Sequence, residues 1–111
     1  MVSYGGEIVR YNPSSSRIEY SRNNGLSWYT RYTGSTIGNV KSLIVHGKEL
    51  LLCSDKGVFY SGNTGLSWYT RSTSYKNFID LQDMGGEILA STDDGHLYYS
   101  RNNGLSWYRR R

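Results

Sequence analysis

One octapeptide occurs three times in this chain of 111 residues, and it constrains the fold more than any other feature. It reads Ser-Arg-Asn-Asn-Gly-Leu-Ser-Trp at residues 21–28 and again at 100–107, and Ser-Gly-Asn-Thr-Gly-Leu-Ser-Trp at 61–68. The copies begin at residues 21, 61 and 100, so the offsets are 40 and 39 residues, a period typical of arrays in which each repeat is one supersecondary unit. All three tryptophans lie in this segment, which we call the Trp box.

Each repeat contains short extended runs separated by turns. In the second repeat, the runs at residues 40–45, 49–54, 58–60 and 68–70 are separated by Gly-containing turns and by the Trp box. The third repeat predicts strands at residues 78–81, 87–91, 96–99 and 105–109. β-rich runs bounded by Gly, Asp and Asn predict antiparallel meanders. We expect one array over residues 1–111, with repeats at 1–38, 39–77 and 78–111, the first with a shortened opening strand.

The Trp box resembles the Asp-box, also called the BNR repeat, whose consensus is Ser/Thr-x-Asp-x-Gly-x-Thr/Ser-Trp. The copies match it at both hydroxyl positions, the glycine and the tryptophan, and have Asn at the Asp position. Asn and Asp both bond the backbone two residues on and tolerate left-handed conformations, so the turn survives this exchange. The resemblance implies a structural role for Ser21, Asn23, Gly25, Ser27, Trp28, Ser61, Asn63, Gly65, Ser67, Trp68, Ser100, Asn102, Gly104, Ser106 and Trp107.

The resemblance also implies an all-β fold, a β-propeller of four-stranded blades similar to those of sialidases and sortilin-like proteins. In that family the boxes join the third and fourth strands at the outer rim, away from the ligand. We expect Trp28, Trp68 and Trp107 to turn inward between neighbouring sheets.

The number of blades suggests an assembly. Propellers have about four to eight blades, and this chain encodes two complete repeats and most of a third. We therefore predict a six-bladed ring completed by homodimerisation, with residues 1–4 near the junction between chains. A fragment of a longer propeller and an engineered short repeat protein stay open as alternatives.

Composition sets further expectations. The net charge of +4 is modest and no nucleic-acid-binding module occurs, so nucleic acid is not an expected partner. No membrane-spanning run or signal-peptide pattern is present, so we expect a soluble protein of unknown location. The single Cys53 is expected to be a buried apolar side chain. Three equivalent arginines, Arg31, Arg71 and Arg110, are expected to form a solvated basic rim.

Catalysis is not expected. The sialidases that the resemblance brings to mind clamp their substrate with three arginines and use a tyrosine paired with a glutamate. Such a site needs different residues from different blades, whereas these repeats place the same residue in every blade. The Phe/Tyr-Arg-Ile-Pro motif of those enzymes is absent. His46 and His96 occupy non-equivalent turns, so we predict no metal and no cofactor.

A repeated binding module is the favoured function, with carbohydrate as the ligand, because aromatic faces stack on sugar rings while polar groups meet the hydroxyls. The candidate ligand-binding residues are Tyr32, Tyr75, Asp80, Asp83, Asp93, Asp94 and His96. Tyr29, Tyr69 and Tyr108 are expected to be packing or strand residues. A protein-interaction or assembly scaffold, or a propeller without ligand, is the alternative. The variable connections at residues 35–39 and 72–77 favour a binding surface if they line one mouth of the ring.

Overall fold

The computed structural model describes all residues 1–111, and its regular structure consists of β-strands in three four-stranded antiparallel sheets. The first sheet contains β1 (Val2–Tyr4), β2 (Glu7–Asn12), β3 (Arg17–Ser21) and β4 (Tyr29–Tyr32). The second contains β5 (Val40–His46), β6 (Glu49–Ser54), β7 (Gly57–Ser61) and β8 (Tyr69–Ser72). The third contains β9 (Phe78–Asp83), β10 (Ile88–Thr92), β11 (Leu97–Ser100) and β12 (Tyr108–Arg109).

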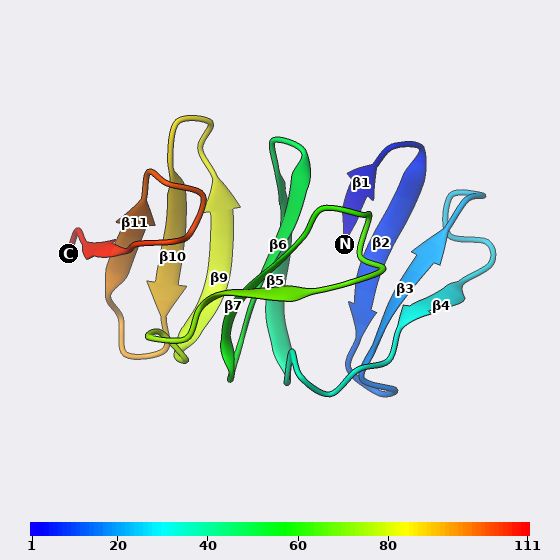
Figure 1. The fold of residues 1–111 in the computed structure, drawn as a ribbon, viewed down its shortest axis with the longest axis horizontal. Coiled ribbons are helices and arrows are strands. Elements are labelled where there is room, and N and C mark those ends of the chain that lie inside the picture. The colour runs from blue at the N-terminus through cyan, green and yellow to red at the C-terminus, as the bar shows by residue number, and fades with distance from the viewer.

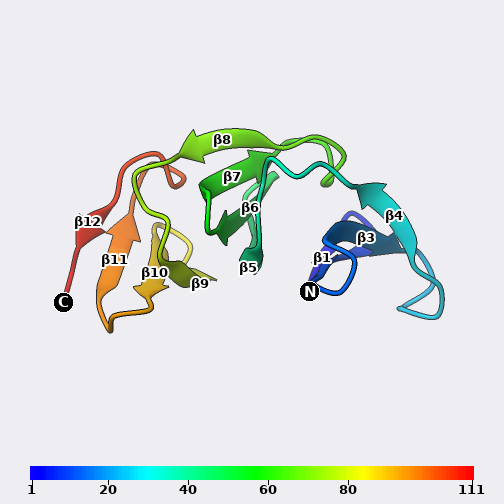
Figure 2. The same cartoon turned by 90° about the horizontal axis from the view of Figure 1, so that it is seen from below.

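Strands pair in sequence order within every sheet, and a Trp box joins the third strand to the fourth. The three sheets stand side by side in an arc, with β1, β5 and β9 on the inner side and β4, β8 and β12 on the outer side (Figure 2). In the first two sheets, the turn between the second and third strands and the connection to the next sheet lie at the same end (Figure 1). No helix of a length and apolar character suited to crossing a membrane is found.

The sheets are held together by two apolar cores, one at each interface between neighbouring sheets. The core between the first two sheets consists of Val9, Ile18, Ile37, Leu50, Leu52, Phe59 and Trp68. The core between the second and third sheets consists of Leu51, Cys53, Val58, Phe78, Leu81, Ile88, Ala90 and Trp107. Strand β6 contributes to both, because successive side chains point to opposite faces of a sheet. Its uninterrupted run Leu-Leu-Leu-Cys therefore reflects a strand covered on both faces.

The first sheet has one face with no neighbouring sheet, and its sequence differs there. Leu52 and Phe59 are directly opposite each other on β6 and β7 and face the first sheet. The equivalent cross-strand pair in the first sheet is Arg10 and Glu19, whose Nε and Oε1 atoms lie 3.0 Å apart. The free face of the first sheet therefore carries an ion pair at the position of a buried apolar pair in the second sheet.

Residues 1–4 were expected near a junction between chains. Within the chain, β1 pairs with β2, and its Val2 and Tyr4 side chains pack toward the core shared with the second sheet. The Tyr4 hydroxyl also donates to the backbone carbonyl of Lys48 in that sheet, at 2.5 Å. The opening strand therefore fastens the first sheet to the second.

Candidate functional site

Each Trp box is a closed turn held by two polar side chains. Ser21 Oγ donates to Asn23 Oδ1 at 2.8 Å and accepts from the Gly25 amide at 2.8 Å. Asn23 Oδ1 also accepts from the Ser27 amide at 2.9 Å. The same bonds occur in the other two boxes. Because the Asn oxygen acts only as an acceptor, it does what an aspartate oxygen would do at this position.

The tryptophans do not all occupy the same environment. Trp68 and Trp107 are 7% and 5% exposed, and their indole N–H groups donate to the carbonyls of Gly65 and Gly104 at 3.0 and 2.9 Å. Trp28 lies half-buried on the free face of the first sheet, with the Arg10 guanidinium 3.8 Å from its ring centroid. Within this chain, Trp68 and Trp107 fill the spaces between neighbouring sheets as expected, whereas Trp28 faces no other sheet of the chain.

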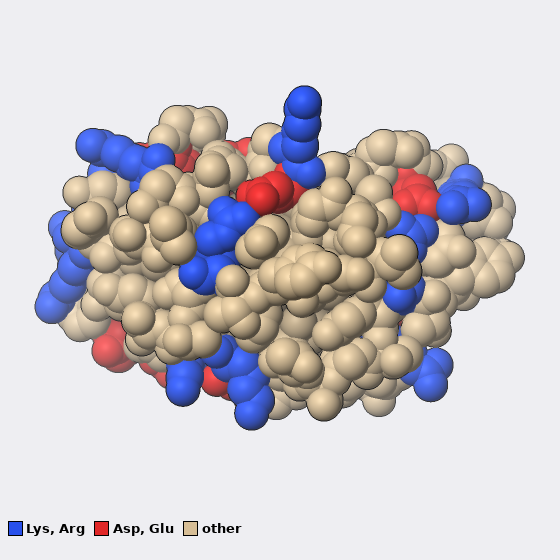
Figure 3. Space-filling model, in the orientation of Figure 1, with Lys and Arg blue, Asp and Glu red and all other residues tan.

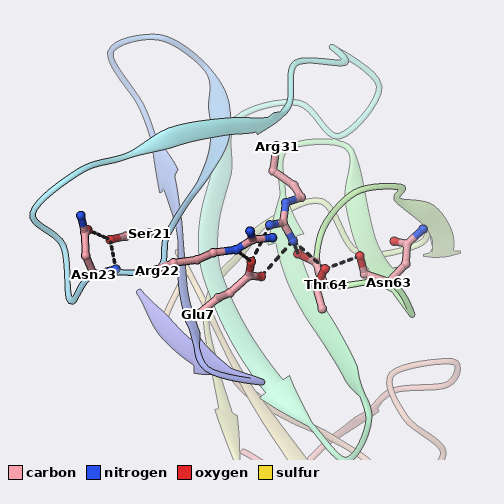
Figure 4. Close-up of polar contacts among 7 residues, drawn as sticks. All are labelled: Glu7, Ser21, Arg22, Asn23, Arg31, Asn63 and Thr64. Atoms are coloured by element: carbon pink, nitrogen blue, oxygen red, sulfur yellow. Dashed lines mark hydrogen bonds and ion pairs between the residues drawn. The ribbon is translucent and has the colours of Figure 1, made fainter.

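The expected solvated basic rim is wrong for Arg31 and Arg71, because these two arginines are clamps between sheets, whereas Arg110 bonds only within its own sheet. Arg31 Nη2 lies 2.8 Å from Glu7 Oε2, and Arg31 Nη1 donates to the Thr64 carbonyl at 3.2 Å in the next box (Figure 4). Arg71 makes the equivalent bonds, to Glu49 and to the Asn103 carbonyl, both at 2.8 Å. The Arg31 and Arg71 side chains are only 9% and 13% exposed.

The clamp has an electrostatic consequence. The hydrogen bond from Arg31 holds the pKa of Glu7 below its ordinary value, against the opposing effect of burial, and Arg22 adds to the same shift. The Glu7 carboxylate therefore stays charged while it joins two sheets through Arg31.

A pair of tyrosines stands on the outer side of every sheet, and we call these the rim tyrosine pairs. They are Tyr20 with Tyr29, Tyr60 with Tyr69, and Tyr99 with Tyr108. The partners are directly opposite on the third and fourth strands, with ring centroids 5.7, 5.7 and 5.8 Å apart and planes tilted by 38 to 39°. The clamp arginine lies over the inner ring of each pair, at 3.8, 3.9 and 4.2 Å from its centroid.

The outer tyrosines of the pairs, Tyr29, Tyr69 and Tyr108, are strand residues, as the sequence allowed, and each is more than half exposed. The leucines at the tips of the boxes, Leu26, Leu66 and Leu105, are also more than half exposed. Beside the first pair, Tyr20, Arg22, Asn23 and Tyr29 line a surface hollow of about 370 Å³. The outer edge therefore presents the same aromatic and apolar side chains three times.

The two predicted ligand-binding tyrosines lie within the packing of the molecule. Tyr32 packs against the core between the first and second sheets. Tyr75 stacks on Phe78 with ring centroids 5.1 Å apart, and its hydroxyl donates to the Trp107 carbonyl at 3.3 Å. Both side chains are half-buried, so neither presents an open aromatic face.

The remaining predicted residues are spread over three places. Asp80 lies on the inner strand β9 beside Ser42, and Asp83 lies at the end of that strand, with Oδ1 3.0 Å from His46 Nδ1. The bond from His46 lowers the pKa of Asp83. Asp93, Asp94 and His96 do lie together, in the turn between β10 and β11. There the Thr92 hydroxyl donates to Asp94 and lowers the pKa of that carboxyl.

The variable connections at residues 35–39 and 72–77 lie at the same end of the sheets as the turns between the second and third strands (Figure 1). Asp55 Oδ1 accepts from the Asn39 amide at 2.8 Å, and Asp93 Oδ1 accepts from Asn77 Nδ2 at 3.3 Å. A polar hollow of about 520 Å³ at this end is lined by residues 15–17, 33–35, 38 and 39. This end is thus a second candidate surface, although its connections are tied to neighbouring turns.

The charge pattern and the donor groups limit the chemistry of the molecule. Lys and Arg side chains are dispersed over the face drawn in Figure 3, with acidic side chains beside several of them, and form no continuous basic patch there. No group of three or more His, Cys, Asp or Glu side chains is arranged to hold a metal ion.

Comparison with known proteins gives the architecture. No protein-family model and no curated protein matches this chain. A solved structure, "YCF48 bound to D1 peptide", aligns with a TM-score of 0.66 at 17% sequence identity over 86% of this chain and 33% of that one. This chain thus spans about a third of the length of that β-propeller protein. The fold is propeller-like, and each of the three sheets corresponds to a blade.

Proposed function

We propose that this chain is a non-catalytic β-propeller binding module, built from repeats of the Asp-box type, that contacts its ligand through the rim tyrosine pairs. The observation that carries this proposal is the repeated exposure of Tyr29, Tyr69 and Tyr108 at one position in all three blades. Large exposed apolar groups that recur on a surface are typical of interaction sites. A ligand with a repeating structure could engage several pairs and gain avidity from weak individual contacts.

Carbohydrate is the ligand class that the first pair supports best. The exposed face of Tyr29 offers a stacking surface for the C–H groups of a sugar ring. Arg22 and Asn23 line the same hollow and can meet hydroxyl groups. The nitrogen of the Asn23 side chain takes no part in the hydrogen bonds that close the box, because the box uses its Oδ1. The hollow therefore combines an aromatic surface with polar groups.

A non-catalytic role is supported by the equivalence of the blades. The rim pairs have nearly the same geometry in each blade, whereas hydrolysis of a glycosidic bond needs two differently tuned groups at one bond. Three similar pairs suit repeated binding.

Protein binding is a second candidate, favoured by a different observation. Leu26, Leu66 and Leu105 are exposed three residues before the outer rim tyrosines in sequence, and they suit an apolar partner better than a hydroxylated one. The structural neighbour of similar fold is described as bound to a peptide.

We also propose that two copies complete a six-bladed ring. The support is the character of the two free end faces, where Trp28 and Ile8 on the first blade and Leu89 and Leu97 on the third are only half-buried. Their equivalents in the covered interfaces, Trp68, Leu50, Leu51 and Val58, are buried.

The test uses three triple variants on a glycan array and on an immobilised peptide library. Y29A/Y69A/Y108A should abolish glycan binding, and L26S/L66S/L105S should retain it. The control K41A/K56A/K76A removes exposed side chains elsewhere and should bind like the wild type. A wild-type chain that binds no glycan at high concentration contradicts the carbohydrate proposal. Peptide binding that is lost with the leucines would favour the protein partner.

A further inference from the structure

Two of the three clamp arginines reach into the Trp box of the following blade, and both donate to the backbone carbonyl at the same position of that box. Arg31 donates to the carbonyl of Thr64, and Arg71 donates to the carbonyl of Asn103. Both acceptors immediately precede the box glycine and have left-handed φ values, 63° and 64°. The clamp is therefore a repeated element of the interface between blades.

The third clamp arginine, Arg110, makes only half of this contact. Its Nη1 and Nη2 atoms donate to the Glu87 carboxylate at 2.7 and 3.1 Å, and its guanidinium lies 4.2 Å from the Tyr99 ring centroid. These contacts match those that orient Arg31 on Glu7 and Tyr20. Arg110 bonds to no box carbonyl, and its side chain is 37% exposed. It is held in the clamp position, so little side-chain freedom remains to be lost when an acceptor arrives.

The matching acceptor lies at the opposite end of the molecule. Asn24 precedes Gly25 in the first box and has a φ of 59°, close to the values of Thr64 and Asn103. No clamp arginine reaches its carbonyl in this chain. Asn24 also lines a hollow of about 280 Å³ with residues 3–8 on the first blade.

A second contact between neighbouring blades also recurs, and it comes from the turn between the first two strands of a blade. The turn between the first two strands places Tyr4 and His46 at equivalent positions, and each side chain bonds to the following blade. His46 Nε2 lies 3.0 Å from Asn103 Oδ1, next to the carbonyl that Arg71 uses. The equivalent residue in the third blade is Met84, which is exposed. An unbranched, adaptable thioether suits the hollow beside Asn24.

The free faces would also form an apolar contact, but a weaker one than the internal interfaces. Leu89 and Leu97 occupy the positions of Leu51 and Val58, which are fully buried in the second blade. They would meet a face on which Arg10 and Glu19 replace an apolar pair. Because an ion pair loses hydration on burial, this interface should be reversible, whereas the internal ones persist as long as the chain is folded.

We infer that two copies of this chain bind head to tail, with Arg110 of each copy donating to the Asn24 backbone carbonyl of the other. The inference rests on the proposed six-bladed ring and names the contact that closes it. The occupant of each free face is a second copy, because its complementary face repeats the internal acceptor, the left-handed φ and the receiving hollow.

The test is sedimentation equilibrium of wild-type chain and two arginine variants over a wide concentration range. R110A should weaken the dimer at least about tenfold, because a hydrogen bond from a charged donor is lost. R109A, which removes the exposed neighbouring arginine, should leave the dissociation constant unchanged. Circular dichroism of each variant at low concentration shows whether the blades stay folded.

A disulfide provides a second readout that does not depend on the stability of R110A. The N24C/M84C variant should form a closed covalent dimer under mild oxidation, whereas each single variant should not form the closed species. Equal dissociation constants for wild type and R110A, together with a closed covalent dimer of N24C/M84C, would overturn the arginine contact and leave the ring standing. A wild-type monomer at every concentration would overturn both. Open head-to-tail chains that R110A disrupts would support the contact and contradict the ring.

Discussion

The first Trp box and the two that follow it differ in surroundings far more than in sequence. All three share the internal hydrogen bonds from Ser and Asn, so the turn itself needs no neighbour. Gly65 and Gly104 lie against the preceding blade, close to Ile18 and Val58 respectively, whereas Gly25 has only its own Trp28 nearby. The comparison separates what a local motif encodes from what an interface adds.

The blade faces show the same contrast, and here the sequence has adapted. The interface of the second blade carries Leu52 opposite Phe59, and the free face of the first carries Arg10 opposite Glu19. Arg10 also lies over Trp28, so it covers part of an aromatic ring that an adjacent blade would otherwise cover. Within the chain, the charged pair thus lies on a free face and the apolar pair on a covered one.

Placing a charged residue on a covered face, or an apolar residue on a free face, tests the contrast directly, and the first change should have the largest effect on the free energy of unfolding. L52R places an unpaired charge in the core between the first and second blades, where Leu52 is fully buried. Burying an uncompensated charge costs about 3 to 5 kcal/mol, so we expect loss of most folded protein. R10L, on the free face, should change stability by less than about 1 kcal/mol. Urea denaturation followed by circular dichroism measures both, and equal costs would contradict the distinction between the faces.

Truncating a tryptophan to alanine should give the next largest loss of stability. W68A removes a ring that is 7% exposed and should cost about 3 to 5 kcal/mol, whatever the protein concentration. W28A should cost less in dilute solution, because its ring has no neighbouring blade. If the ring of two chains forms, the cost of W28A should rise with concentration. A large cost at Trp28 in dilute solution would mean that the free face is covered within the chain.

The reactivity of a cysteine thiol should also differ between a covered face and a free face. Burial raises the pKa of the Cys53 thiol from 9.0 to about 12, and the side chain is fully buried. Ser91 occupies the equivalent position on the free face of the third blade and is half-buried. In S91C and in C53A/S91C, residue 91 should react with a thiol reagent at pH 8 at least about 100-fold faster than Cys53 does in the wild type. Comparable rates would show that both faces are equally accessible.

The smallest expected effect is the loss of stability at low pH when the Glu7 carboxylate, which binds the clamp arginine Arg31, becomes protonated. The pKa of Glu7 is lowered below 4.5 in the folded chain, mainly by the hydrogen bond from Arg31. A lowered carboxyl pKa stabilises the folded state fully above the unfolded pKa, and this contribution is lost as the pH falls through the folded pKa. The wild type should therefore be more stable than E7Q at pH 7, and the difference should shrink as the pH falls below 4.5.

The third blade supplies the control for that experiment. The pKa of Glu87 is also lowered, first by Arg110, but this pair joins no second blade within the chain. E87Q should change stability less than E7Q at pH 7. A difference between wild type and E7Q that persists unchanged at pH 2 would show that Glu7 acts through packing rather than through its charge.

The candidate site was predictable only in part. The repeat placed Tyr29, Tyr69 and Tyr108 at equivalent positions, but their spacing is the same whether a strand face is covered or exposed. Tyr32 ends β4 and Tyr75 follows β8, both near variable connections, which suggested an open surface, yet both side chains pack against interface cores. The carboxylate partners could have been found, since Glu7, Glu49 and Glu87 begin or precede the second strand of every repeat. They recur as regularly as the clamp arginines, which lie in the fourth strand or directly after it.

The sequence by itself determined the repeat, the meander of short strands within it and the turn chemistry of the Trp box. These depend on residues close together in the chain, so hydrogen bonds and backbone preferences suffice to encode them. Only the tertiary structure decided which face of each blade is covered, which tyrosines are exposed and which box carbonyl each arginine reaches. Such contacts join residues about 30 positions apart, as in Arg31 with Thr64 and Arg71 with Asn103, and they exist only where a neighbouring blade supplies the second surface.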